Sequence, residues 1–207
     1  EEGAAIVVHL GMSGQLRLMG AGAGKPDKHV HVVWMVEGGL ELWFRDPRRF
    51  GGVWAFADRA ELERYLDELG PDALEIEAGE LRERLRDSRR AIKAALLDQR
   101  VLAGVGNIYA DEALFEARIR PGRLATRLTD ADWGRLAGSI RATLRRAVDA
   151  RGSTLRDYRD AQGQEGGAQL LHAVYGRAGE PCPVCGGELR GIRLAQRATV
   201  YCPRCQG

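Results

Sequence analysis

Four cysteines near the carboxyl end place the strongest constraint on how this chain can fold. They form two C-x2-C pairs, Cys182 with Cys185 and Cys202 with Cys205, and sixteen residues separate the pairs. Four thiolates in this spacing supply a closed tetrahedral shell, which is typical of a structural zinc site. Glycines in the intervening stretch allow a hairpin that brings the pairs together. Iron is the main competing metal, whereas two disulfides or a redox-active C-x-x-C pair suit a chain without a secretory signal poorly.

The segment from 171 to 207 has few large apolar residues, so the metal is expected to supply most of its folding free energy. That contribution is on the order of 10 kcal/mol, and removing the metal is expected to unfold the segment. Five arginines, two glutamates and a tetrathiolate zinc site leave the segment close to neutral. Phosphate binding would then depend on where the arginines point, and the hairpin tip from Arg193 to Arg197 is the predicted contact.

The charge of the chain is nearly balanced but unevenly distributed. Lysine and arginine total 31 and aspartate and glutamate 29, yet residues 58–87 carry a net charge of −6 and residues 88–127 a net charge of +4. All but three of the basic residues are arginines, which suit bidentate contact with phosphate. This composition fits nucleic-acid binding, and it fits a GC-rich genome or heat tolerance equally well.

The sequence contains neither a membrane-spanning apolar run nor a signal peptide, so we expect a cytoplasmic protein with no membrane partner. The chain begins at Glu1 and enters an apolar run, Ile6 to Leu10, almost at once. We therefore expect the sequence to begin inside a sheet, after the early strands of that sheet.

Short runs rich in valine, isoleucine and aromatic residues predict a β domain over the first 57 residues. A turn at Glu37-Gly38-Gly39 joins two of the strands into a hairpin. From Asp58 the apolar period becomes helical, and Gly70-Pro71 ends the first helix. Thr129 is the predicted N-cap of the longest helix, whose apolar stripe runs from Leu136 to Val148. The predicted strands are 6–10, 15–18, 30–36, 40–44 and 53–56, and the predicted helices are 58–69, 78–86, 88–102, one opening at 107, and 130–151.

Two loops are of functional interest. Gly104 and Gly106 allow a tight turn with exposed backbone amides, and Asn107 is the predicted cap of the helix that follows. This is the arrangement of a phosphate clamp, although a plain helix-turn-helix corner has the same pattern. The polar, glycine-rich stretch 160–167 predicts a mobile loop that is either part of a site or a linker before the zinc segment.

Several sequence blocks in one order resemble the bacterial formamidopyrimidine-DNA glycosylases and their endonuclease VIII relatives, and the resemblance spans nearly the whole chain. It implies an α+β fold with one structural Zn²⁺. The implied domains are a truncated N-terminal β-sandwich at 1–57, a helical domain with a helix-two-turn-helix motif at 58–170, and a C-terminal β-hairpin zinc finger at 171–207. The blocks are His9-Leu-Gly-Met-Ser-Gly14, Lys28-His29-Val-His31, Asp46-Pro-Arg-Arg-Phe-Gly51, Gly104-Val-Gly-Asn-Ile-Tyr-Ala-Asp-Glu112, Val174-Tyr-Gly-Arg177, and Gln196-Arg-Ala-Thr with the cysteine pairs.

The resemblance implies a base-excision repair enzyme that flips a damaged purine out of duplex DNA, cuts its glycosidic bond and breaks the backbone by β- and δ-elimination. Met12, Arg48 and Phe50 match the side chains that fill the vacated space, a role that suits a flexible apolar chain, a guanidinium and an aromatic ring. Without the resemblance, Met12 and Phe50 would be assigned to the core. Damaged double-stranded DNA is the implied partner, and the implied setting is a monomer in the bacterial cytoplasm, associated with the nucleoid.

Further positions match functional residues of the family. Lys93 matches a lysine near the lesion, and Glu112 matches an acid that supports the active site. Arg197, at the hairpin tip, matches the arginine assigned to phosphate contact and to δ-elimination, and it is the catalytic residue implied within this chain. The residues that match phosphate contacts are His29, Arg49, Asn107 and Tyr175. The resemblance implies that Arg48 and Lys93 also bind DNA.

Two departures from the family pattern affect what the resemblance implies. The nucleophile of the family is an N-terminal proline whose secondary amine forms a Schiff base at C1′, beside a glutamate and a lysine from an early loop. The early part of the pattern is missing here and Glu1-Glu2-Gly3 is no substitute, so the chain as printed is expected not to cleave the bond. Purine-specific members carry a Pro-Gly-aromatic element where Glu165-Gly-Gly167 stands.

The Arg48-Arg49-Phe50 wedge favours oxidised purines, 8-oxoguanine and formamidopyrimidines, as substrates. Three alternatives stay open. They are an endonuclease VIII-like glycosylase for oxidised pyrimidines, a non-catalytic zinc-containing module that binds DNA, and a zinc-ribbon protein that binds no nucleic acid. DNA affinity that falls steeply with salt would exclude the last of these.

Overall fold

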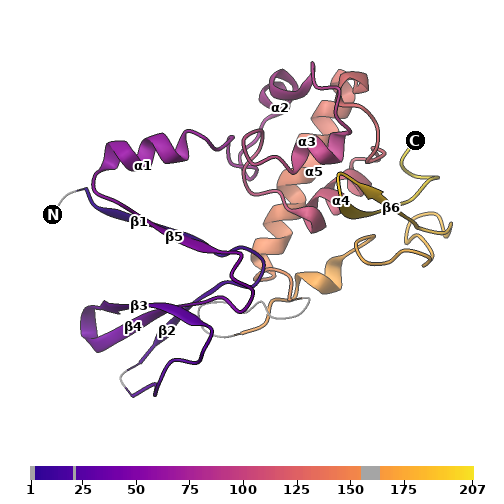
Figure 1. Ribbon diagram of the computed structural model, residues 1–207. Coiled ribbons are helices and arrows are strands. Elements are labelled where there is room, and N and C mark those ends of the chain that lie inside the picture. Colours follow the sequence, from indigo (N-terminus) through magenta and orange to yellow (C-terminus); the bar gives the residue numbers. More distant parts are fainter. Residues whose placement is uncertain (1–2, 21, 155–163) are drawn as a thin grey trace. The chain divides into compact units, whose positions relative to one another are not determined.

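The computed structural model describes residues 3–20, 22–154 and 164–207. The described residues group into two compact units. The colours of Figure 1 follow the sequence through them. The first unit comprises Glu1–Leu66 and Asp149–Leu170, and the second comprises Asp67–Val148 and Leu171–Gly207. The chain therefore leaves the first unit, builds most of the second, and returns to the first before it ends in the second.

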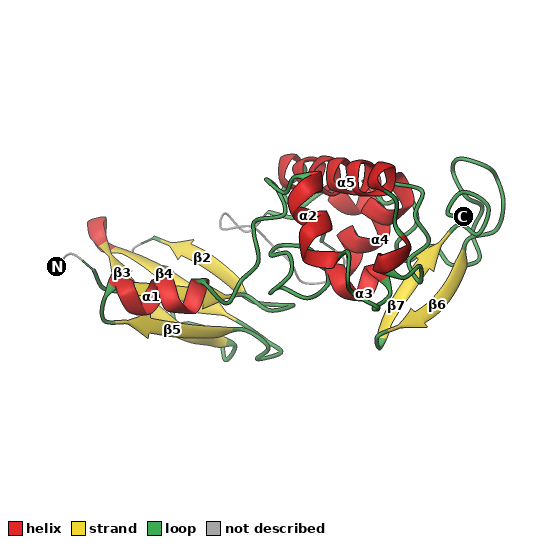
Figure 2. Ribbon diagram, turned by 90° about the horizontal axis from the view of Figure 1, so that it is seen from above, coloured by secondary structure: helices red, strands yellow, loops and turns green. Residues whose placement is uncertain are grey.

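The first unit contains two small antiparallel sheets. β1 pairs with β5 (Figure 1), and β4 lies between β2 and β3 (Figure 2). The turn Glu37–Gly39 joins β3 to β4, and Gly38 and Gly39 adopt φ values of 76° and 70° there, a region that glycine occupies without strain. Each strand prediction is confirmed to within one residue at either end. The strands are β1 (Ala5–His9), β2 (Gln15–Met19), β3 (Val30–Val36), β4 (Leu40–Arg45) and β5 (Gly52–Phe56).

Helix α1 (Arg59–Leu66) packs on β5 through Tyr65, whose ring centroid lies 5.9 Å from that of Trp54 and 5.2 Å from that of Phe56. It begins one residue later than predicted because Asp58 caps it, accepting the Glu61 N–H at 2.9 Å. These contacts group α1 with the sheets. The predicted domain boundary between residues 57 and 58 stays a prediction.

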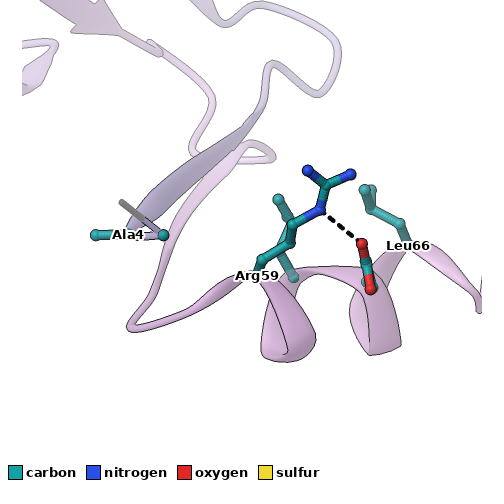
Figure 3. A pocket seen from close by; sticks show the side chains of 6 residues that line it. Ala4, Arg59 and Leu66 are labelled. Carbon is teal, nitrogen blue, oxygen red and sulfur yellow. Dashed lines mark hydrogen bonds and ion pairs between the residues drawn. The ribbon is translucent and has the colours of Figure 1, made fainter. Parts of the chain in front are cut away.

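An open hollow lies beside α1 in the first unit (Figure 3). Ala4 and Leu66 contribute to its wall, and the Arg59 Nε donates to the Glu63 carboxylate at 2.7 Å along the helix. Because Ala4 precedes β1, the hollow is at the amino-terminal end of that strand, whereas the loop that carries Met12 follows its carboxyl-terminal end.

The second unit has a helical core and a two-stranded β-hairpin. Leu114, Trp133, Leu136 and Ile140 are among the buried residues of one continuous apolar cluster. The two-stranded hairpin packs against helix α4. The helices are α2 (Ala78–Leu85), α3 (Ile92–Leu96), α4 (Asn107–Glu116) and α5 (Asp130–Asp149), and the strands are β6 (Arg190–Leu194) and β7 (Arg197–Tyr201).

The prediction of one long helix over 88–102 is wrong, since α3 covers only Ile92–Leu96. Before this helix the backbone pairs with a distant segment: Ile92 N–H donates to the Arg123 carbonyl at 2.8 Å. After it the chain turns around Asp98, whose carbonyl accepts the Val101 N–H at 2.8 Å. These hydrogen bonds use backbone groups that a longer helix would need. The helical period of the sequence does not reveal them.

Helix α5 begins as predicted, with Thr129 as its cap. The Asp132 N–H donates to Thr129 Oγ1 at 3.2 Å, while the Thr129 N–H donates to the Asp132 carboxylate at 2.8 Å, so the two residues cap the helix reciprocally. Leu136 and Leu144 of the predicted stripe are buried, but Val148, in the last turn, is exposed.

No helix within the described ranges is long and apolar enough to span a membrane. The first half of the predicted loop 160–167, residues 160–163, lies outside the described residues. In its described part, the Gly166 N–H donates to Thr154 Oγ1 at 2.8 Å and the Gly167 N–H to the Ala150 carbonyl at 2.7 Å.

Candidate nucleic-acid interface

The four cysteine sulfurs converge at the base of the β6–β7 hairpin. All four Sγ atoms lie within 4.8 Å of one another, with Cys182 and Cys205 at 3.9 Å and Cys185 and Cys202 at 3.5 Å. A tetrahedral zinc ion with its usual Zn–S bonds holds sulfurs about 3.8 Å apart. The arrangement therefore fits zinc and is too wide for disulfides.

The chemistry of the thiols also fits a cation. Burial and the three neighbouring thiols raise the pKa of the Cys205 thiol to about 12. A divalent ion reverses this penalty because it binds the thiolate form. Sulfur occupies all four positions of a tetrahedral ion, so the zinc is structural.

Gln206 ties this metal centre to the helical core. Its side chain is fully buried, its Oε1 accepts the Cys202 N–H at 2.8 Å, and its Nε2 donates to the Ile119 carbonyl at 2.9 Å. Sequence reasoning missed this residue, because a glutamine beside a metal site carries no signal of its own.

A buried ion pair fastens strand β7 to the helices. Lys93 Nζ lies 2.7 Å from Asp111 Oδ1, and both side chains have 0% of their surface exposed. The ammonium also donates to Thr199 Oγ1 at 2.7 Å and to the Ala198 carbonyl at 2.9 Å. Asp111 Oδ2 accepts the Val200 N–H at 3.0 Å. A contact of Lys93 near a DNA lesion stays a prediction.

Burial dominates the electrostatics of this pair. It raises the pKa of Asp111 to about 6 although Lys93 opposes the shift, and it lowers the pKa of Lys93 although Asp111 opposes that one. The pair links the helices to β7, since Lys93 and Thr199 are 106 residues apart in the sequence. The cost of this link is the removal of two charges from water.

The glycine corner before α4 differs from the prediction in one respect. Gly106, which has no side chain, is the N-cap, and Asn107 is the first helical residue. Asn107 does not cap the helix: its Nδ2 donates to the Ala198 carbonyl at 3.1 Å. Gly104 adopts a φ of 98°, which favours glycine. Helix α4 thus starts beside strand β7, which begins at Arg197.

Glu112 is buried and folds the segment that carries Tyr175. Its carboxylate accepts the backbone N–H groups of Ala173, Val174 and Tyr175 at 2.8, 2.9 and 2.7 Å. Arg177 Nη1 donates to the Ala173 carbonyl at 2.8 Å and holds the same turn from outside. Tyr175 is left half-buried, with its ring edge to face against His172.

The hairpin tip is a two-residue turn between Leu194 and Arg197, which are paired in the sheet. Ala195 and Gln196 adopt φ values of 46° and 62°, as tight hairpin turns of this kind require. Arg193 and Arg197 are exposed on either side of the turn.

In the first unit, the loop after β1 and the loop before β5 present large exposed side chains. Met12 is 67% exposed and Phe50 is 61% exposed, so neither belongs to the core. Arg48 and Arg49 are also exposed, and Arg49 has a φ of 55°. His29 is half-buried, and its carbonyl accepts the Asp46 N–H at 2.9 Å at the start of the loop before β5.

Three family models match successive parts of the chain. Residues 1–53 match the formamidopyrimidine-DNA glycosylase N-terminal domain, residues 69–159 the formamidopyrimidine-DNA glycosylase H2TH domain, and residues 179–207 the zinc finger found in FPG and IleRS.

Individual proteins agree with these models. A formamidopyrimidine-DNA glycosylase of Symbiobacterium thermophilum is 49% identical over 204 residues, covering 97% of this chain and 67% of that protein. The crystal structure of the MutM (FPG) protein of Thermus thermophilus superposes with a TM-score of 0.88 at 44% identity, covering 100% of this chain and 77% of that one. The Lactococcus lactis Fpg in complex with abasic-site DNA has a TM-score of 0.89 at 34% identity, covering 99% and 75%.

A β-rich unit, a helix-two-turn-helix core and a four-cysteine hairpin define the class of zinc-finger DNA-repair glycosylases. Matches over nearly the whole chain agree on one branch of that class. The chain belongs to the formamidopyrimidine-DNA glycosylase family.

Proposed function

We propose that this chain recognises oxidised purines, 8-oxoguanine and formamidopyrimidines, in duplex DNA, as part of the glycosylase and AP-lyase chemistry of its family. The observation that carries the proposal is the exposure of Met12 and Phe50 on two loops that also present Arg48. Large apolar side chains at loop tips are unfavourable in water but well suited to a gap in stacked bases. Similar solved structures include a MutM bound to DNA that contains carbocyclic 8-oxo-G, which supports this lesion class.

We propose roles for the remaining residues that their positions support. Arg197 stands at the exposed hairpin tip, where a guanidinium can reach phosphate and act in δ-elimination. Asn107 begins α4, whose amino-terminal amides attract phosphate. Glu112 supports the site by folding the turn that presents Tyr175. Lys93 anchors β7, and its proposed DNA contact lies near the lesion. His29, Arg49 and Tyr175 complete the proposed phosphate contacts.

Gap filling can be measured with a duplex that carries a tetrahydrofuran abasic analogue opposite 2-aminopurine, whose fluorescence reports stacking. We expect Met12→Ala to weaken binding of this duplex about tenfold relative to undamaged duplex, since burying a methionine side chain contributes about 1.5–3 kcal/mol. Met35→Ala is the matched control, because Met35 is 71% exposed on β3 of the same unit. Equal affinities and fluorescence for the two variants would overturn the proposal.

Lesion class can be tested by competing duplexes that contain 8-oxoguanine or dihydrothymine. Tighter binding of the 8-oxoguanine duplex is expected, and tighter binding of dihydrothymine would favour the oxidised-pyrimidine alternative. That this chain does not itself cleave the glycosidic bond stays a prediction. Strand incision by the purified chain would contradict it and would leave the DNA-binding roles untouched.

We further propose that the protein acts as a monomer on the nucleoid in a bacterial cytoplasm. The organisms of the relatives support the setting. Sedimentation of the chain with one short duplex, at a mass of one protein per duplex, would support the monomer, and two proteins per duplex would contradict it.

A further inference from the structure

One buried carboxylate connects the two loops that carry Met12, Arg48 and Phe50. Asp46 is 1% exposed and stands where β4 ends and the second of these loops begins. Its Oδ1 accepts the Ser13 hydroxyl at 2.7 Å, and its Oδ2 accepts the Gly51 N–H at 2.7 Å. The carboxylate therefore spans from the loop after β1 to the far end of the loop before β5.

The same hydrogen bonds touch the chain directly beside each gap-filling side chain. Ser13 follows Met12, and Gly51 follows Phe50. The Arg48 N–H is shared between Ser13 Oγ and Asp46 Oδ1, each at 3.3 Å. The Asp46 carboxylate thus holds the backbone at or beside three side chains on two loops.

Close backbone contact leaves the loops little freedom around this group. A Cβ on Gly11 would lie 2.7 Å from the carbonyl carbon of Phe50, and a Cβ on Gly51 would lie 2.5 Å from the His9 carbonyl oxygen. Both glycines are therefore required for the loops to pack together. Burial opposes the charged form of Asp46, but the hydrogen bonds from Ser13 and from backbone N–H groups outweigh it and lower the pKa.

We propose that Asp46 and Ser13 are positioning residues that hold the Met12 loop and the Arg48–Phe50 loop in one arrangement before DNA binds. Ordering the loops in advance removes an entropy loss that would otherwise accompany insertion into the duplex. The inference rests on the proposed gap-filling role of Met12, Arg48 and Phe50. It adds that the side chains act together because their backbones share one buried hydrogen-bond acceptor.

The test uses Asp46→Asn and Ser13→Ala, with Asp58→Asn as the control. Asp58 is a carboxylate of the same unit that caps α1, and asparagine caps a helix equally well. We expect both test variants to lose about tenfold in preference for the abasic duplex over undamaged duplex, while affinity for undamaged duplex is unchanged, since phosphate contacts dominate that term. The control is expected to behave as the unmodified chain.

A double-mutant cycle distinguishes positioning from a general structural role. In a Met12→Ala/Phe50→Ala background, Asp46→Asn is expected to have almost no further effect on preference, because the side chains it positions are gone. Additive losses would overturn the inference. If Asp46→Asn fails to fold, Ser13→Ala decides, since it keeps the carboxylate; unchanged preference in Ser13→Ala overturns the inference. If Met12→Ala/Phe50→Ala itself leaves preference unchanged, the proposed function fails instead.

Discussion

Replacing Lys93 by methionine removes a buried charge while keeping a side chain of similar length. The substitution leaves Asp111 fully buried without its cation, and it deprives Thr199 and the Ala198 carbonyl of their donor. Breaking a buried ion pair from one side costs about 3–5 kcal/mol. The pKa of Asp111 is already about 6 beside Lys93, so removal of the cation is expected to protonate Asp111 at neutral pH. A protonated Asp111 carries no buried charge, and the decrease in unfolding free energy therefore stays within the range given above.

Urea unfolding followed by tryptophan fluorescence, to which Trp133 of the same unit contributes, measures this change. Lys25→Met is the matched control, because Lys25 is exposed and surface substitutions change stability by about 0.5 kcal/mol at most. The double variant Lys93→Met/Asp111→Leu is expected to be less destabilised than the sum of its parts. Its recovery is incomplete, since the Val200 N–H then has no acceptor, which costs about 1–3 kcal/mol. A loss for Lys93→Met equal to that of the control, or strictly additive losses, would refute this reasoning.

Three further predictions concern the metal, the hairpin tip and pH. Cys185→Ser is expected to release zinc and unfold the hairpin, measured with a colorimetric chelator and by circular dichroism, whereas Val184→Ala, in the same turn, keeps the metal; retained zinc in Cys185→Ser would contradict the site. Arg197→Ala is expected to weaken duplex binding about tenfold with zinc in place, as one lost phosphate contact does, while Arg190→Ala, at the other end of β6, has less effect; equal effects would argue against the tip. The folded-state pKa of Asp111, about 6, lies above its ordinary 3.8, so the folded state retains a proton that the unfolded state loses, and the stability from this group falls as pH rises through that window. The unfolding free energy from this group falls by at most about 1.4 kcal/mol per pH unit. Asp111→Asn is expected to abolish this pH dependence in urea unfolding at pH 4 to 6. The same slope of unfolding free energy against pH in the variant and the unmodified chain would contradict the assignment of the raised pKa to Asp111.

Local patterns in the sequence were sufficient where local physics decides the structure. The β3 strand at Val30–Val36 and the glycine turn after it were predictable, because alternating side chains and positive φ are properties of neighbouring residues. The cysteine spacing predicted the metal centre for the same reason, since two short turns and a hairpin set its geometry. The capping pair at Thr129 and Asp132 is equally local.

Long-range contacts decided the rest. The helix predicted over 88–102 was shortened because Ile92 donates to a carbonyl that lies thirty-one residues away. Lys93 carries the same letter whether it is exposed or paired with a buried carboxylate, and only its packing against Asp111 and β7 shows that it is buried. Likewise, the exposure of Met12 and Phe50 cannot be read from their apolar character, which suits a core equally well. The sequence by itself determined the local elements and the zinc ligands, whereas the tertiary structure decided which charges are buried and which apolar side chains face water, because burial depends on residues far apart in the chain.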